Sequence, residues 1–170
     1  MILSHGDGGN GRAFLAPWLK TAEKYKVVII SPSLQEDVPT RMGAFEQIRA
    51  TIAHAVTRFK TRPKAFGIGF SSGGTHFQIL ANDSPELFAG FAAHSSSALG
   101  NFAETSPAEV LRRMPILITC GMKGRSASCQ SSVSLVSVAK RKKFANVRYQ
   151  KVTNVKGLVK ATERFMGRYW

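Results

Sequence analysis

The sequence predicts an α/β fold, a three-layer structure in which a mostly parallel sheet of six strands has helices on both faces. Two observations predict it. Short apolar runs alternate with segments of helical periodicity along the whole chain, which is typical of βαβ units. The runs are nearly continuous and lack polar alternation, so we expect strands that are covered on both faces. A chain of 170 residues fits a single domain over residues 1–170.

Six strands and six helices are expected in alternation. The predicted strands are residues 1–5, 26–31, 64–70, 88–94, 115–120 and 146–152. The predicted helices are residues 12–24, 42–60, 72–82, 106–113, 129–143 and 157–169. Ser106-Pro107 is a helix-start signal, a serine cap followed by proline. In such sheets the chemistry lies beyond the carboxyl ends of the strands, which here are His5, Pro32, Ser71, His94 and Cys120.

The composition excludes several classes of protein. An apolar fraction of 44% is ordinary for a globular chain and excludes disordered and collagen-like classes. No apolar run approaches the ~18 residues of a membrane span, and we expect no signal peptide. Two cysteines are too few for a disulfide framework or a zinc site. We expect Cys120 and Cys129 to be free thiols in the cytoplasm, with a bridge across a loop as the alternative.

The net charge of +14 is concentrated in the last third of the chain. Residues 110–170 contain 14 lysines and arginines and one acid, Glu163, whereas residues 1–109 are nearly balanced. Such a field favours anionic partners, for example nucleic acid, acidic lipid or an acidic substrate. No aromatic interleaving or nucleic-acid motif accompanies the charge, so a solvated surface is the simpler interpretation.

The stretch Gly69-Phe70-Ser71-Ser72-Gly73 fits the G-x-S-x-G pattern of a nucleophile elbow. It joins the predicted strand 64–70 to the predicted helix 72–82. In this setting the glycines leave room for a strained turn that lifts the serine hydroxyl above the sheet. We therefore predict Ser71 as a nucleophile. The alternative is a Gly/Ser loop that binds nothing.

A second glycine-rich stretch, His5-Gly6-Asp7-Gly8-Gly9, follows the first predicted strand. Backbone N–H groups of such a loop can hold an anion, either a phosphate or the oxyanion of a tetrahedral intermediate. The glycines do not fit the Walker A or dinucleotide-binding patterns, which disfavours phosphate. A nucleophile elbow needs one oxyanion donor from such a loop and a second from the residue after the nucleophile.

Together the two motifs resemble the α/β-hydrolase superfamily, most closely its carboxylesterase, feruloyl-esterase and polyhydroxybutyrate-depolymerase-like branch. The resemblance covers nearly the whole chain and extends to residues 85–93 and 115–121. It implies Ser71 as nucleophile, the backbone N–H groups of Ser72 and Asp7 as the oxyanion hole, and a supporting loop that contains His5, Gly6, Gly8 and Gly9. The family's leading strands are missing, so a minimal six-stranded version is expected.

The acid and the histidine of the family's triad are not at their usual positions. An Asp is expected about three residues after Cys120-Gly121, where this chain reads Met122-Lys123-Gly124-Arg125. No histidine follows His94, and Lys156 stands roughly where the family has its histidine. A serine without a base is a poor nucleophile, because its proton must leave as it attacks.

Several residues are candidates for the missing roles. His94 ends the strand beside the elbow strand and is the candidate base, with a satisfied polar residue at a strand end as the alternative. Lys156 would serve only if burial lowered its pKa by several units. Glu104 is a candidate acid or a loop charge. His76 is expected to be a packing or surface residue, and nothing suggests chemistry for His54.

The sequence therefore predicts a serine hydrolase of the carboxylesterase type, which cleaves small or activated esters by acyl transfer through Ser71. Partial triads keep roughly 10³–10⁴-fold catalysis over water, so weak activity without a proper base is physically reasonable. No cofactor and no metal are expected. The alternative is a weak or inactive hydrolase-fold protein whose residues 110–170 bind an anionic partner. A diverged copy without selected activity is a third hypothesis.

Overall fold

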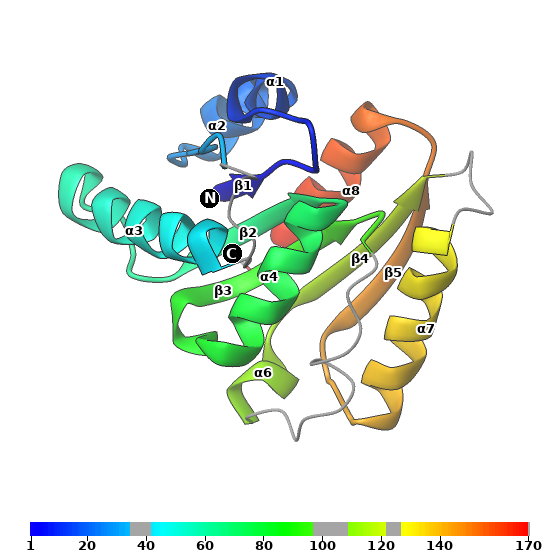
Figure 1. The fold of residues 1–170 in the computed structure, drawn as a ribbon. Helices are drawn as coiled ribbons and strands as arrows, with labels where there is room; N and C mark the ends of the chain where they lie inside the picture. The colour runs from blue at the N-terminus through cyan, green and yellow to red at the C-terminus, as the bar shows by residue number, and fades with distance from the viewer. Residues whose placement is uncertain (35–41, 97–108, 122–126, 170) are drawn as a thin grey trace.

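Five parallel strands form the central sheet, in the order β1-β2-β3-β4-β5 (Figure 1). The computed structural model describes residues 1–34, 42–96, 109–121 and 127–169. The strands are β1 (Ile2–Ser4), β2 (Ala65–Phe70), β3 (Phe88–His94), β4 (Ile116–Gly121) and β5 (Val147–Val152). Every neighbouring pair is parallel, so the carboxyl ends of all five strands meet at one edge of the sheet.

Helices follow the strands and cover both faces of the sheet (Figure 1). They are α1 (Gly11–Leu15), α2 (Leu19–Tyr25), α3 (Met42–Phe59), α4 (Ser72–Asp83), α6 (Glu109–Arg113), α7 (Ala127–Arg141) and α8 (Val155–Met166). Two short 3₁₀ helices lie at Ala16–Trp18 and Pro85–Leu87. Asparagine side chains cap two helix starts, because Asn10 accepts from the Ala13 N–H of α1 and Asn154 from the Gly157 N–H of α8, each at 2.8 Å. The start signal at Ser106-Pro107 lies outside the described residues.

The predicted sixth strand, residues 26–31, is wrong as a strand. The structure reduces it to an isolated parallel bridge between Ile2 and Ile30. Two backbone bonds hold it, from the Leu3 N–H to the Ile30 carbonyl at 2.8 Å and from the Ile30 N–H to the Met1 carbonyl at 3.1 Å. The physical reason is the length of its partner: β1 has three residues, which is too short to pair with all of an adjacent apolar run. The sheet therefore has five strands, with this segment along its β1 edge.

The core has two layers, one on each face of the sheet. On one face, α3, α4, α6 and α7 bury Ile48, Phe77, Leu111 and Leu135 against the strands. On the other face, Trp18 and α8 pack against the strands, with Leu158, Ala161 and Phe165 contributed by α8. Burial of apolar surface on both faces explains the nearly continuous apolar strands of the sequence. In the described part of the chain, no helix is long and apolar enough to cross a membrane.

Candidate active site

Ser71 occupies the sharp turn between β2 and α4, at the carboxyl edge of the sheet. Its backbone has φ 54° and ψ −122°, a conformation that a side-chain-bearing residue rarely adopts and that costs of order 1–3 kcal/mol. The surrounding structure holds this turn: the Ser71 N–H donates to the His94 carbonyl at 2.9 Å, and the Gly74 N–H donates to the Ser71 carbonyl at 3.0 Å. The predicted strand–turn–helix context of Ser71 is therefore present.

The two glycines of the predicted elbow allow the chain to cross itself closely. A Cβ on Gly69 would overlap the backbone of Gly73, and a Cβ on Gly73 would overlap the Ser4 carbonyl oxygen at the end of β1. No side chain fits at either position without a shift of the backbone. The start of α4 thus lies directly against the ends of β1 and β2, and the turn keeps Ser71 above the sheet.

The loop after β1 lies beside Ser71 and is held by His5. A Cβ on Gly6 would lie 3.0 Å from the Ser71 Cβ, so this loop and the elbow are in close proximity. His5 is buried and uses both ring nitrogens: Nε2 accepts from the Leu34 N–H at 3.0 Å, which leaves Nδ1 to donate to the Gly6 carbonyl at 2.8 Å. His5 is therefore a structural residue of the loop, and its ring has no free nitrogen for proton transfer.

The predicted oxyanion donors lie on these two segments. Asp7 is exposed in the turn after His5-Gly6, where the Gly9 N–H donates to the Gly6 carbonyl at 3.0 Å and Gly8 has φ +69°. Ser72 is the first residue of α4, a position whose N–H has no acceptor within the helix. Among the described residues, neither the Asp7 nor the Ser72 N–H donates a hydrogen bond. Both donors are thus available to an anion.

His94, the predicted base, contacts Ser71 through its backbone, and its ring bonds elsewhere. His94 is 9% exposed, and Nδ1 of its ring shares a 2.6 Å hydrogen bond with the Thr119 hydroxyl. It also packs against the Phe70 ring, with the centroids 5.3 Å apart. Within the described chain, the Ser71 hydroxyl makes no hydrogen bond to a histidine or a lysine. Sequence reasoning missed Thr119, because its meeting with His94 follows from the β3–β4 register.

Burial determines the protonation state of His94. Desolvation lowers its pKa from 6.5 to about 4, because the charged imidazolium loses its hydration. The imidazole is therefore neutral at pH 7. Its Nε2 has no hydrogen-bond partner among the described residues. When the ring proton is on Nδ1, this nitrogen donates the hydrogen bond to the Thr119 hydroxyl. The lone pair of Nε2 can then accept a proton.

The remaining candidate bases lie in environments that do not suit the role. His76 shares a 3.1 Å hydrogen bond with the Ser4 hydroxyl and packs edge-on against Phe45 on α3, in line with a packing role. Lys156 is exposed near the start of α8, so it lacks the buried environment that a lysine needs to act as a base. His54 is exposed on α3. Glu104 and the four residues 122–125, where the family has its acid, lie outside the described residues.

A buried network of hydroxyl and amide groups lies beneath α4. Ser96, which is 3% exposed, accepts from the Gln78 amide at 2.8 Å and shares a 3.2 Å hydrogen bond with the Thr75 hydroxyl. The Ser132 hydroxyl of α7 donates to the Ser96 carbonyl at 3.1 Å. These groups join α4, the end of β3 and α7 just behind the elbow, and the sequence pattern did not reveal them because they come from three distant segments.

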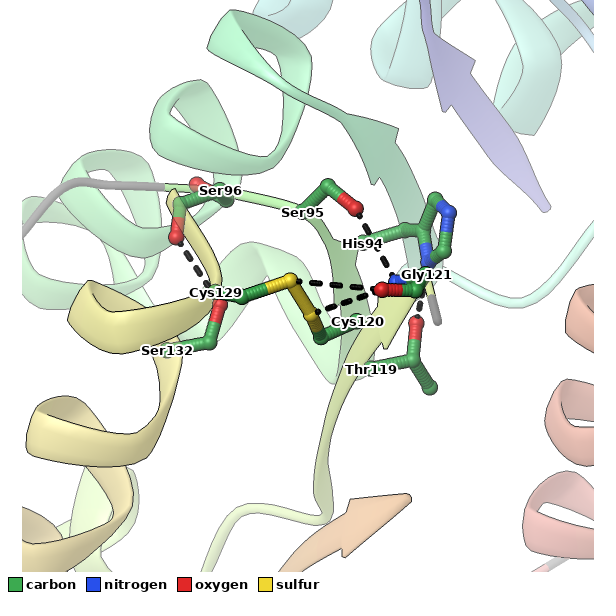
Figure 2. Close-up of a disulfide and its surroundings, with 8 residues drawn as sticks. All are labelled: His94, Ser95, Ser96, Thr119, Cys120, Gly121, Cys129 and Ser132. Carbon is green, nitrogen blue, oxygen red and sulfur yellow. Dashed lines mark hydrogen bonds between the residues drawn. A yellow bond between two sulfur atoms is a disulfide. The ribbon is translucent and has the colours of Figure 1, made fainter. Parts of the chain in front are cut away.

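Cys120 and Cys129 are joined by a disulfide, so the expectation of two free thiols is wrong (Figure 2). Their Cα atoms lie 5.5 Å apart, within the usual range for a bridge, because the first turn of α7 packs against the end of β4. Both cysteines are buried. The bridge joins residues on either side of 122–126, and both of its sulfur atoms lie against the Gly121 carbonyl (Figure 2). It therefore fixes the end of β4 where the carboxyl edge of the sheet meets α7.

Solved structures of other proteins match this chain over almost its full length. SOBER1 of Arabidopsis thaliana is 18% identical with a TM-score of 0.78, and the match covers 99% of this chain and 97% of that one. The Bacillus cereus carboxylesterase is 17% identical with a TM-score of 0.72, and the match covers 98% of this chain and 87% of that one. The fluorophosphonate-binding serine hydrolase FphF of Staphylococcus aureus is 14% identical with a TM-score of 0.77, and the match covers 99% of this chain and 82% of that one. No protein-family model and no curated protein sequence matches the chain.

At sequence identities of 14–18%, these matches concern the fold of the chain. The sheet order, the turn that holds Ser71 and the full-length superpositions agree with one another. The predicted fold class is confirmed, with five strands in place of six: the chain has the α/β-hydrolase fold, in a minimal form.

Proposed function

We propose that this protein is a serine hydrolase of the carboxylesterase type, which cleaves small or activated esters by acyl transfer through Ser71. The observation that carries the proposal is the strained backbone of Ser71, at φ 54°, with the Gly6 loop packed against its side chain. A binding module has no need for a strained serine opposite two free N–H donors, whereas acyl transfer requires both.

In the proposed reaction, the Ser71 hydroxyl attacks the ester carbonyl carbon while its proton passes to Nε2 of His94. The oxyanion that forms accepts hydrogen bonds from the Ser72 and Asp7 N–H groups. Collapse of this intermediate expels the alcohol, which takes the proton from His94, and leaves an acyl-serine. Water then attacks the acyl group with the same proton path, which releases the carboxylic acid and restores Ser71.

His94 is proposed as the base because its environment fits the role better than that of the other candidates. His5 has both nitrogens engaged, His76 bonds Ser4, and Lys156 is exposed. Thr119 would hold the ring of His94 as a carboxylate does in a full triad. A hydroxyl brings no negative charge to stabilise the imidazolium, so the base is weak. For that reason the proposed substrates are esters with a good leaving group.

The test is hydrolysis of p-nitrophenyl acetate and labelling by a fluorophosphonate probe. We expect labelling of the wild type, and loss of both labelling and turnover in Ser71→Ala. The matched control is Ser137→Ala, an exposed serine on α7 whose hydroxyl bonds a helix carbonyl; it should behave as the wild type. A folded wild type that neither labels nor hydrolyses the ester would end the esterase proposal, and an active Ser71→Ala would end the assignment of the nucleophile.

A second candidate function, binding of a polyanion, is favoured by one feature of α8. Lys156, Lys160 and Arg164 follow one another at i, i+4 intervals, and Arg168 continues the series just beyond the helix. All four are exposed, and neighbouring members are about 6 Å apart along the axis. Among the described residues none of them forms an ion pair with an acid. The one acid of α8, Glu163, is bonded to Thr21 and Lys24 instead. We call these four residues the basic stripe.

The basic stripe is tested by binding a labelled single-stranded oligonucleotide over a range of salt concentrations. The affinity of the wild type should fall steeply as the salt concentration rises. In Lys156→Gln/Lys160→Gln, the slope of log K against log salt should be less steep by about 1.4. The matched control, Arg12→Gln/Lys20→Gln, removes two exposed cations from the first helices and should leave the slope as it is. A flat salt response, or an equal loss in the control, would exclude the stripe as a binding surface.

We also propose a cytoplasmic location, although one observation argues against it. A reducing cytoplasm keeps thiols free, whereas the structure bridges Cys120 and Cys129. Alkylation of thiols at the moment of cell lysis distinguishes the two cases. Alkylation of both cysteines would support a cytoplasmic location. Absence of alkylation at both would support an oxidising compartment.

A further inference from the structure

A pocket of about 700 Å³ lies at the amino ends of the strands, between α3 and the β1 edge of the sheet. Its volume is in the range of small-molecule sites. Ala65, which begins β2, lines it, whereas Ser71 follows the end of β2. A strand of six residues separates them, which is roughly 20 Å at the usual rise of an extended chain. The pocket is thus at the opposite edge of the sheet from the candidate active site.

The walls of the pocket are apolar. One wall is a single face of the last turns of α3, formed by Ile52, Ala55, Val56 and Phe59. Phe59 is 48% exposed and extends this wall to the surface, where its ring also contacts His54 and Arg58. The facing wall is the start of β1 with the edge segment 27–30, which contributes Val28 and Ile30.

Small residues form the floor. Ala65 and Ala89 line the pocket at the starts of β2 and β3. The β2–β3 register shifts at this point, where Ala65 pairs with Phe88 and Phe66 pairs with Gly90. Ala89 is therefore left without a partner in a bulge, a feature that is over-represented beside functional sites. Methyl side chains at these two positions leave the volume that larger apolar residues would fill.

The rim of the pocket is cationic. It is lined by four exposed cations, Lys26, Lys60, Arg62 and Lys64, and no Asp or Glu is among the described residues of the lining. Lys26 and Lys60 both follow helices with φ 52°, a left-handed conformation that glycine adopts at lower cost. Lysine thus occupies two positions beside the pocket where the backbone favours glycine. Four cations around an apolar slot complement a ligand with one anionic end and one apolar end.

We propose that this pocket binds a long-chain carboxylate, with the unbranched chain between α3 and β1 and the carboxylate at the rim. The hydrocarbon chain of the ligand would cover Phe59, Ala65 and Ala89. The rim cations would form hydrogen bonds to the carboxylate oxygens. Burial of the chain supplies the affinity and the rim sets the polarity of the head group. The site is separate from Ser71, and its occupation does not depend on esterase activity.

The proposal is tested by calorimetric titration of the whole protein with octanoate, decanoate and dodecanoate below their micelle concentrations. Full burial of the chain predicts a gain in affinity of about fourfold per methylene. Dodecanol, which has the same chain without the charge, should bind at least tenfold more weakly than dodecanoate. No binding of dodecanoate, or equal binding of dodecanol, would overturn the proposal. An absence of chain-length dependence would overturn it as well.

Two pairs of variants locate the site. Ala55→Trp fills the pocket and should weaken dodecanoate binding at least tenfold, whereas Ala53→Trp, on the exposed face of the same helix, should bind as the wild type does.

Arg62→Glu/Lys64→Glu reverses two rim charges and should abolish the preference for dodecanoate over dodecanol. The control Lys140→Glu/Arg141→Glu makes the same change on the exposed end of α7 and should retain that preference. Equal effects of the members of either pair would place the ligand elsewhere and end the proposal; circular dichroism confirms that each variant is folded.

Discussion

Nδ1 of His94 lies 2.6 Å from the Thr119 hydroxyl, so the partner of this buried imidazole is a neutral group on the neighbouring strand. In a full serine-hydrolase triad that partner is a carboxylate, whose charge stabilises the protonated ring. Among the described residues no charge offsets the loss of hydration, and the pKa of His94 falls to about 4. The same contact therefore orients the ring and leaves it a weak base, and two predictions follow from it.

The stability of the protein should depend on the protonation of His94. The pKa is 6.5 in the unfolded chain and about 4 in the folded one, so the unfolded state binds more protons between these values. The contribution of His94 is complete above pH 6.5 and is lost as the pH falls toward 4, where the loss reaches about 3 kcal/mol. Urea unfolding at pH 7 and pH 4 measures it. In His94→Gln, which cannot titrate at this position, the free energy of unfolding should fall by about 3 kcal/mol less between pH 7 and pH 4. An identical fall in both proteins would show that His94 is not the titrating group.

Removal of the Thr119 hydroxyl should affect both stability and turnover. Thr119→Val keeps the shape of the side chain but leaves Nδ1 of His94 buried without a partner, which costs about 1–3 kcal/mol. If Thr119 orients the proposed base, kcat falls while KM changes little. Thr57→Val is the control, because Thr57 is an exposed threonine on α3 and such changes stay within about 0.5 kcal/mol. A Thr119→Val protein with wild-type kcat would show that the contact has no part in catalysis.

The close approach of α4 to β1 should make Gly73 intolerant of a side chain. A Cβ there would overlap the Ser4 carbonyl oxygen, and only a backbone shift relieves that clash, so Gly73→Ala should lower the free energy of unfolding by about 3 kcal/mol or more. Gly157→Ala is the matched control: its Cβ would meet nothing closer than 3.5 Å, within α8. There alanine should stabilise the helix by about 0.5–1 kcal/mol. Equal effects of the two changes in chemical denaturation would contradict the close approach.

The features that could be predicted from the sequence depend on short stretches of chain. The β2–Ser71–α4 turn is encoded within ten residues, so the motif alone predicted its context. Strand β3 was predicted with the bounds that the structure has, Phe88–His94, because both of its faces are buried and the apolar run shows its full length. Segment 26–31 has an equally apolar run, yet its pairing depends on the length of β1, which the run itself does not reveal.

The features that could not be predicted depend on contacts between distant segments. The place of His94 at a strand end predicts it as the base, but its partner Thr119 is 25 residues further along the chain. The Ser96 network joins three elements through hydroxyl groups that have no sequence pattern. For the cysteines, a spacing of nine residues suits a bridge or two thiols equally, and only the packing of α7 on β4 brings the Cα atoms to 5.5 Å.

The disulfide should contribute measurably to stability, because it closes a loop in the unfolded chain. For a sequence separation of nine residues, the loss of loop entropy corresponds to about 2–3 kcal/mol. Cys120→Ala/Cys129→Ala should therefore unfold at lower urea concentration than the oxidised wild type, by that difference in free energy. Dithiothreitol should destabilise the wild type and have no effect on the double variant. Since the bridge fixes the end of β4 beside His94, reduction should also lower the rate of any Ser71-dependent hydrolysis. A wild type whose unfolding is insensitive to dithiothreitol would show that Cys120 and Cys129 are not bridged in solution.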